Sequence, residues 1–184
     1  MVSNPQRRSL LADAGLRVLA ASGARGLTHR AVDTEAGVPA GTASNYFRSR
    51  DALLAGLGER IFERLAPDPA GLVGRTTVAD FLRYIVERTT AQPDLTRALF
   101  ELRLEGGRNP ALGRLLAGVL HEGYRQDVAF HTGAGLPGGA FEVALLHYAL
   151  DGLLFDLLTT SIGADVDVTA AIEALADRLT VARI

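Results

Sequence analysis

Apolar residues recur at helical spacing along nearly the whole chain, and no stretch alternates as a strand would. Six segments carry this spacing, over residues 9–22, 50–65, 78–91, 95–105, 110–130 and 168–181. A further segment, 140–161, is apolar on almost every side, and two short helices are expected between residues 28 and 47. The pattern therefore predicts an all-α protein of about nine helices.

Turn-forming residues divide this pattern into two parts. The run Pro67-Asp68-Pro69-Ala70-Gly71 interrupts the helical spacing, because two prolines and a glycine disfavour a continuous helix. We therefore predict one domain over residues 1–65 and a second over residues 72–184.

The stretch 28–47 has the pattern of a helix-turn-helix. Thr28 can cap a helix by accepting a hydrogen bond from an amide of its first turn. Gly37 ends that helix, because glycine adopts the left-handed conformation easily. A second helix is expected from Pro39 or Ala40 to Phe47, and a helix in this position is the one that enters the major groove of DNA.

This stretch and its flanks resemble the amino-terminal domain of the TetR family of transcriptional regulators. The residues that carry the resemblance are Leu11-Ala12-Asp13-Ala14, Val18-Leu19, Gly23, Gly26-Leu27-Thr28, Ala36-Gly37-Val38, Gly41-Thr42, Tyr46-Phe47 and Arg50-Asp51-Ala52-Leu53-Leu54. The chain departs from the family at Ser44 and Asn45, where members often carry aromatic residues. The resemblance implies a three-helix DNA-binding domain followed by a helical domain for ligand binding and dimerisation.

Charge is unevenly distributed along the chain. The net charge is −2, but residues 1–64 carry nine arginines against six acidic residues, whereas residues 65–184 carry ten against fifteen. A basic first part suits contact with phosphates. There is no cysteine, which excludes disulfides and thiolate metal sites, and no apolar leader or membrane span is evident, so a cytoplasmic protein is expected.

Short polar residues and nearby cations make up the predicted DNA-binding set. Asn pairs well with adenine, and Ser and Thr contact bases or phosphates. The predicted DNA-binding residues are Thr28, His29, Arg30, Gly41, Thr42, Ser44, Asn45, Tyr46 and Arg50. The expected partner is a double-stranded, palindromic operator.

Three motifs that suggest other chemistry are rejected. Gly133 to Gly138 matches the dinucleotide signature G-x-G-x-x-G, but a helix and not a strand is expected before it. The sequence from His121 has Arg125 where a zinc protease needs its second histidine. His147 and Asp151 share a helix face and are interpreted as a satisfied polar pair in a pocket wall or dimer seam. We predict no catalytic residues, no metal and no cofactor.

The family resemblance also implies a homodimer through the last two helices and a cavity for an effector that releases DNA. The predicted lining of that cavity combines aromatic and isolated polar residues: Tyr84, Phe100, Arg103, Tyr124, His147 and Phe155. The sequence is thus interpreted as a ligand-responsive repressor and not an enzyme. The alternative is a helical small-molecule-binding or enzyme-like bundle without a role on DNA, which the basic first domain disfavours.

Overall fold

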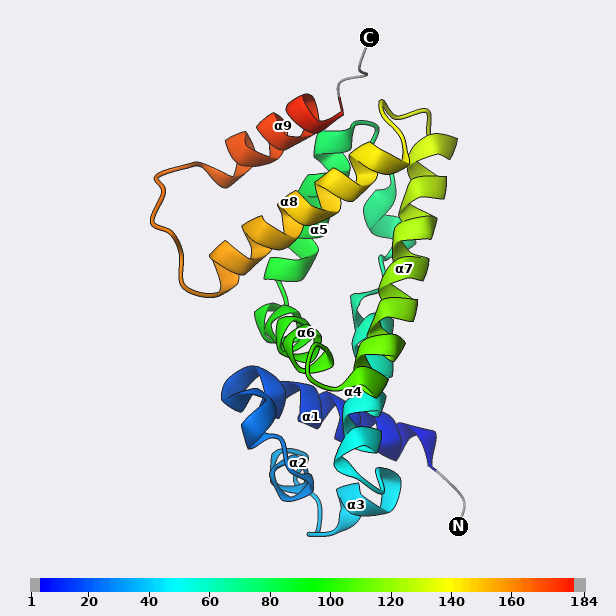
Figure 1. Ribbon diagram of the computed structural model, residues 1–184, viewed down its shortest axis with the longest axis vertical. Helices are drawn as coiled ribbons and strands as arrows, with labels where there is room; N and C mark the ends of the chain where they lie inside the picture. Colours follow the sequence, from blue (N-terminus) through cyan, green and yellow to red (C-terminus); the bar gives the residue numbers. More distant parts are fainter. Residues whose placement is uncertain (1–3, 181–184) are drawn as a thin grey trace. The chain divides into compact units, whose positions relative to one another are not determined.

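In a computed structural model of the chain (Figure 1), residues 4–180 are described. All regular elements within these residues are helical, which confirms the predicted all-α class. The helices are α1 (Pro5–Gly26), α2 (His29–Glu35), α3 (Thr42–Tyr46), α4 (Arg50–Leu65), α5 (Val78–Thr90), α6 (Pro93–Gly106), α7 (Pro110–Gly133), α8 (Ala140–Leu158) and α9 (Val168–Leu179), with a short 3-10 helix η1 (Pro69–Leu72). The last helix was predicted to reach Val181, which lies outside the described residues.

Packing divides the chain into two compact units. The first unit combines the residues up to Ala66 with Pro93–Val119, and the second combines Pro67–Gln92 with the residues from Leu120 onward. The change at residue 66 falls beside the predicted boundary, but the return of 93–119 to the first unit is new. The division into domains 1–65 and 72–184 stays a prediction.

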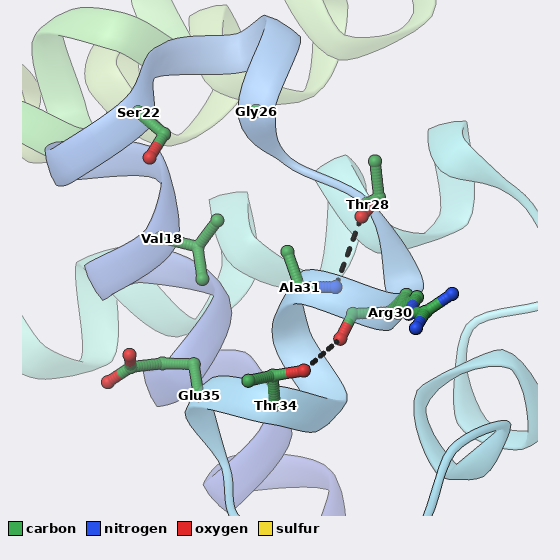
Figure 2. Close-up of a pocket in the computed structure, with 8 residues that line it drawn as sticks. All are labelled: Val18, Ser22, Gly26, Thr28, Arg30, Ala31, Thr34 and Glu35. Atoms are coloured by element: carbon green, nitrogen blue, oxygen red, sulfur yellow. Dashed lines mark hydrogen bonds between the residues drawn. The ribbon is translucent and has the colours of Figure 1, made fainter.

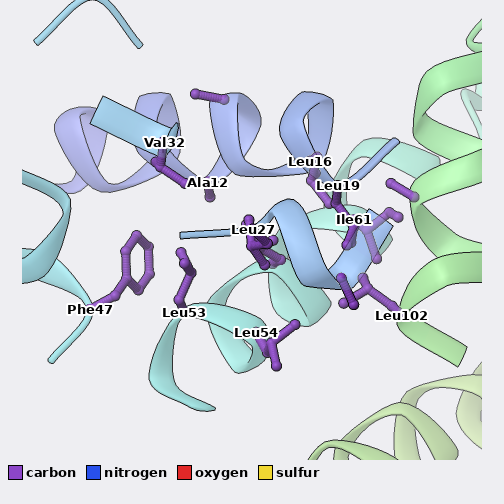
Figure 3. Packing of buried hydrophobic residues seen from close by; sticks show 14 of the residues in the cluster. Ala12, Leu16, Leu19, Leu27, Val32, Phe47, Leu53, Leu54, Ile61 and Leu102 are labelled. Carbon is purple, nitrogen blue, oxygen red and sulfur yellow. The ribbon is translucent and has the colours of Figure 1, made fainter. Parts of the chain in front are cut away.

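The first unit is built around an apolar core to which α1, α2, α3, α4, α6 and the start of α7 contribute (Figure 3). Leu19, Leu57 and Leu102 are completely buried and come from α1, α4 and α6. On α1, Gly23 leaves helical geometry at φ 63°, so the regular helix stops where the sequence predicted and a short turn follows. The core holds α2 and α3 against a larger helical frame.

A polar cross-link also joins α1 to α4 in this unit. Both carboxylate oxygens of Asp13 accept hydrogen bonds from Arg60 at 2.9 Å, and Arg64 donates to the same carboxylate at 3.0 Å. Burial raises the pKa of Asp13, but these two arginines outweigh burial and hold the pKa below its usual value. The cross-link therefore consists of three charged side chains at neutral pH.

The second unit packs α8 and α9 against α5. One row of α8 is buried, with Leu146, Leu150 and Leu154 facing the unit's interior, whereas Phe141, Tyr148 and Phe155 are exposed. At the start of α5, the Thr77 hydroxyl accepts a hydrogen bond from the amide of Asp80, whose carboxylate accepts one from the amide of Thr77. Within residues 4–180, none of the helices has the length and hydrophobicity of a membrane-spanning segment.

Candidate nucleic-acid interface

The amino-terminal end of α2 carries three of the predicted DNA-binding residues. Thr28 caps the helix by accepting a hydrogen bond from the amide of Ala31 at 3.1 Å, as the sequence predicted. Arg30 is exposed, and its guanidinium makes no ion pair or hydrogen bond within residues 4–180. His29 instead turns inward, where its Nε2 donates to the carbonyl of Phe47 at 2.6 Å.

Two glycines shape the turn between α2 and α3. Gly37 has φ 63° and ends α2, and Gly41 has φ 90° and stands immediately before α3. A Cβ atom at either position would meet nothing within 4 Å, so the backbone conformation and not the available space favours glycine here.

The second helix of the motif is shorter than predicted. It begins at Thr42 and not at Pro39 or Ala40, because Gly41 in its left-handed conformation occupies the N-cap position. Gly41 has no side chain to satisfy the free amides of α3. The carboxylate of Asp33, from α2, does so by accepting hydrogen bonds from the amides of Gly41 at 2.7 Å and Ala43 at 2.6 Å.

One side of α3 is anchored in the core. Ala43 is completely buried, and Phe47, which caps the helix at its carboxyl end, is 1 % exposed. The Phe47 ring packs against Gly56 of α4, where an added Cβ would overlap it. Figure 3 shows Phe47 pointing toward Leu53 and Val32 within the same core.

The opposite side of α3 faces solvent with short polar side chains. Ser44 and Asn45 are exposed, whereas Thr42 and Tyr46 are half-buried. The hydroxyls of Thr42 and Ser44 donate to the carbonyls of Pro39 and Gly41, which leaves their lone pairs as acceptors. The amide of Asn45 makes no hydrogen bond within the described residues, so both its donor and its acceptor face outward.

The arginines that follow α3 differ in their surroundings. Arg50 was predicted to contact DNA, but its guanidinium donates to the carbonyls of Ala24 at 2.6 Å and Leu27 at 2.7 Å. It therefore binds the end of α1, although a phosphate contact by its exposed part stays a prediction. Arg48 was overlooked in the sequence, yet it is exposed and has no partner within residues 4–180. Its position directly after the second helix is the signal by which the sequence could have identified it.

A hollow of about 400 Å³ lies on the surface between α1 and α2 (Figure 2). It is lined by Val18, Ser22, Gly26, Thr28, Arg30, Ala31, Thr34 and Glu35. Two predicted DNA-binding residues belong to this lining, and none of the predicted effector-binding residues does. The hollow therefore adjoins the candidate nucleic-acid interface.

The six predicted effector-binding residues are divided between the units. Phe100 and Arg103 lie on α6 in the first unit, and Tyr84, Tyr124, His147 and Phe155 lie in the second. The hydroxyl of Tyr84 accepts a hydrogen bond from the amide of Asp68 at 2.8 Å. The aromatic ring of Tyr84 lies under the guanidinium of Arg75, so this residue holds the segment around η1. Effector binding by the set stays a prediction.

Tyr124 of α7 and His147 of α8 are in contact. Their rings meet edge to face with centroids 5.8 Å apart, and His147 Nε2 lies 3.0 Å from Asp127 Oδ2. His147 thus has an acidic partner on another helix, and its predicted pairing with Asp151 stays a prediction. Burial lowers the pKa of Arg88 on α5, against opposing contributions from Tyr84 and Asp127.

The glycine-rich segment after α7 has the context of a loop. The helix α7 precedes it, where a dinucleotide site needs a strand. His131, which is 5 % exposed, fixes the loop through a hydrogen bond from its Nε2 to the carbonyl of Pro137 at 2.8 Å. The structure thus agrees with the rejection of nucleotide binding at this motif.

Comparison with known proteins identifies both parts of the chain. Residues 11–57 match the family model described as bacterial regulatory proteins, tetR family, and residues 73–182 match a tetracyclin repressor-like, C-terminal domain. A TetR family member from Streptomyces coelicolor A3 is similar in structure, with a TM-score of 0.74 and 29% identity, over 97% of this chain and 100% of that one. No curated protein sequence gives a significant match.

Other solved structures share the fold. The multidrug binding protein EbrR complexed with imidazole has a TM-score of 0.68 and 26% identity, over 98% of this chain and 93% of that one. A transcriptional regulator from Rhodococcus sp. Rha1 has a TM-score of 0.70 and 22% identity, over 96% and 94% of the two chains, which supports the fold alone.

Proposed function

We propose, from the premise that this chain belongs to the TetR family of transcriptional regulators, that it is a homodimeric repressor which a small molecule releases from a palindromic operator. Regulators of this family bind DNA and are not enzymes. The observation that carries the proposal is α3, whose buried side is anchored while Ser44 and Asn45 face solvent. A short helix presented in this way suits the major groove.

The contacts we propose fall into two classes. Asn45 and Ser44 contact base edges, with Asn45 offering the donor and acceptor pair that adenine requires. Thr28, Arg30, Tyr46 and Arg48 contact phosphates, which position the helix without reading sequence. Arg48 replaces Arg50 as the principal cation after α3, because the guanidinium of Arg50 already binds two carbonyls.

We further propose that a second copy of the chain covers the exposed row of α8. Phe141, Tyr148 and Phe155 are 58, 73 and 50 % exposed and recur every seven residues along one face. Gly152 on the same helix is exposed with open space around it, so another helix can approach closely. The exposed side of α9 is more polar, with Glu173 and Asp177, so α8 provides most of the apolar contact.

The effector we propose is an apolar or amphipathic aromatic molecule. The similar protein EbrR, at 27 to 28% identity, has been crystallised with proflavin and with malachite green, both of them aromatic. In this chain the ring edges of Tyr124 and His147 and the half-buried Arg88 offer aromatic and polar contacts near one another. Of the other predicted lining residues, Tyr84 lies in the same unit, whereas Phe155 belongs to the exposed row of α8.

Release of DNA requires the effector to bind one conformation of the protein better than the other. The helix α7 contributes residues to both compact units, and its first part packs on α4, where Gly58 leaves room for Leu115 and Leu116. A displacement of α7 therefore acts on α4 and changes the separation of the two recognition helices. A difference of about 1 to 3 kcal/mol between the two conformations is sufficient for an allosteric effect.

The test is a gel shift with the DNA upstream of the protein's own gene, with and without aromatic effector candidates such as proflavin. The wild type should bind in a manner that weakens steeply with salt. The triple variant Thr42→Ala, Asn45→Ala, Tyr46→Ala should lose binding, whereas Val73→Ala, far along the chain from α3, should retain it. Full binding by the triple variant would refute α3 as the reading helix.

A further inference from the structure

We propose that His29 and Asp33 of α2 form a clamp that fixes the orientation of the recognition helix and thereby sets the sequence selectivity of DNA binding. This inference rests on the proposed function, because it assigns the residues that position the DNA-reading surface. The two residues stand four apart on a single seven-residue helix, so one face of α2 carries both.

The recognition helix needs support from outside. It spans five residues, a length far too short for a stable helix in water. Its N-cap, Gly41, has no side chain that could satisfy the free amides. Its shape and direction are therefore set by the groups that contact it.

Asp33 binds the amino-terminal end of α3. The side chain is 3 % exposed, and its Oδ2 and Oδ1 accept hydrogen bonds from the amides of Gly41 at 2.7 Å and Ala43 at 2.6 Å. A carboxylate at this end also interacts favourably with the helix dipole. Because both oxygens are engaged, α3 cannot slide along its axis without breaking at least one bond.

His29 binds the carboxyl-terminal end of the same helix. Its Nε2 donates to the carbonyl of Phe47, the C-cap residue of α3, at 2.6 Å. The apolar contacts of Ala43 and Phe47 hold the helix in the core, but such contacts are not directional. The two polar attachments supply the direction, so that Ser44 and Asn45 leave the helix at a fixed angle.

Loss of the clamp should affect the affinity for a preferred sequence and the affinity for arbitrary DNA to different extents. Base contacts depend on the angle of α3, whereas three of the four proposed phosphate contacts, those of Thr28, Arg30 and Arg48, belong to other segments. A loosened α3 therefore weakens binding to a preferred sequence much more than binding to arbitrary DNA. A role limited to stability would weaken both equally, through the fraction of folded protein.

The experiment uses the full chain and a duplex that the wild type selects from a random 30-base-pair library. A scrambled duplex of equal composition reports non-specific binding. We expect Asp33→Ala and His29→Leu to lower the ratio of selected to scrambled affinity by about tenfold or more. His29→Gln retains an N–H donor and should restore most of the ratio. Asp13→Ala, which breaks the cross-link of α1 and α4 in the same unit, should lower the melting temperature without changing the ratio.

A spectrum of backbone amides gives a second measurement that does not depend on DNA. The amide protons of Gly41 and Ala43 should move upfield in Asp33→Ala, because a carboxylate partner is removed. Should Asp33→Ala fail to fold, Asp33→Asn, with a single acceptor oxygen, replaces it in both measurements. An unchanged affinity ratio in a folded clamp variant would overturn the inference. Failure of the wild type to select any duplex would instead overturn the proposed function.

Discussion

At the scale of single residues, Arg48 and Arg50 show how similar side chains near one helix take different roles. Arg48 is exposed without a partner in the described part of the chain. Arg50 donates to the carbonyls of Ala24 and Leu27 and lies 3.8 Å from Glu105. The carbonyls at the end of α1 lack helical partners, so Arg50 satisfies groups that would otherwise be unpaired.

We therefore predict that alanine substitutions at these two positions affect different properties of the protein. Arg50→Ala should lower the free energy of unfolding by about 1 to 3 kcal/mol, because hydrogen bonds from a charged donor are lost. Arg48→Ala should change it by less than about 0.5 kcal/mol but lower the salt dependence of DNA affinity by about one unit of slope per head. Urea unfolding and titrations at several salt concentrations measure these effects. A stable Arg50→Ala protein would contradict the structural role of Arg50.

The capping residue Asp80 gives a prediction about acid pH. Hydrogen bonds from the side chain and amide of Thr77 and from the amide of Thr76 lower the pKa of Asp80 from 3.8 to about 2. The unfolded chain thus binds this proton at higher pH than the folded chain. The contribution of Asp80 to stability is complete above about pH 4 and is lost as the pH falls toward 2.

The measurement is an NMR titration of the Asp80 carboxyl in the wild type and in Thr77→Val. The variant removes the largest cause of the shift, so its midpoint should rise toward 3.8 while the wild type stays near 2. Asp80→Asn should flatten the dependence of stability on pH in this range. Equal midpoints in the wild type and Thr77→Val would show that the capping box is not formed.

Hydrogen bonds between residues close in the sequence, such as helix caps, were predictable, whereas hydrogen bonds between residues far apart in the sequence were not. The caps by Thr28 and Ser49 join residues three apart, so the residue type and its position before a helix are sufficient to predict them. Asp33 binds amides eight and ten residues away, and Arg50 binds carbonyls 23 and 26 residues away. Those partners are fixed by tertiary packing, which a pattern of neighbouring residues does not contain.

At the scale of elements, glycine permits a close approach where α6 meets α7. A Cβ at Gly113 would lie 2.6 Å from the carbonyl oxygen of Gly106, a backbone atom that cannot easily move. On the same helix, Gly118 has open space around it. Gly113 and Gly118 therefore differ in what they contribute to packing.

This difference predicts effects of opposite sign. Gly113→Ala should destabilise the protein by about 1 to 3 kcal/mol, since the backbone must shift to admit the methyl group. Gly118→Ala is the matched control and should stabilise it by up to about 1 kcal/mol, because alanine favours a helix. Urea unfolding of both variants measures these changes in the free energy of unfolding. Stabilisation by Gly113→Ala would mean that α6 and α7 do not meet this closely.

The helices themselves were largely predictable, because their apolar faces repeat over several turns. The exception with consequences is α3, which was predicted to begin at Pro39 or Ala40 and begins at Thr42. Only five residues long, it has no repeating pattern of its own, and its start is fixed by the conformation of Gly41 and by a carboxylate from α2. The reading surface is thus the part of the site that local sequence predicted least well.

At the scale of the whole molecule, the chain does not fold as two consecutive blocks. Residues 93–119 return to the first compact unit after the second has begun. The break at Pro67–Gly71 was visible in the sequence because turn residues cluster there, whereas the return lies within ordinary amphipathic helices. The helix α7 has residues in both units, and we propose that an effector acts on the DNA-binding surface through it.

A palindromic operator requires two copies of α3 related by a two-fold axis, so we predict that the protein is a dimer. The wild type should have twice the 19.5 kDa mass of one chain in solution. Tyr148→Asp, in the exposed apolar row of α8, should give a monomer, because an unpaired charge would be buried in the interface. Its affinity for a palindromic duplex should fall toward that for a half-site.

The control variant Val73→Asp places the same charge on a residue that is 82 % exposed and lies outside this row, so it should leave the dimer intact. Light scattering and DNA titration measure both properties. A Tyr148→Asp protein that stays dimeric would place the interface on another face, whereas a monomeric wild type would exclude the two-fold arrangement altogether.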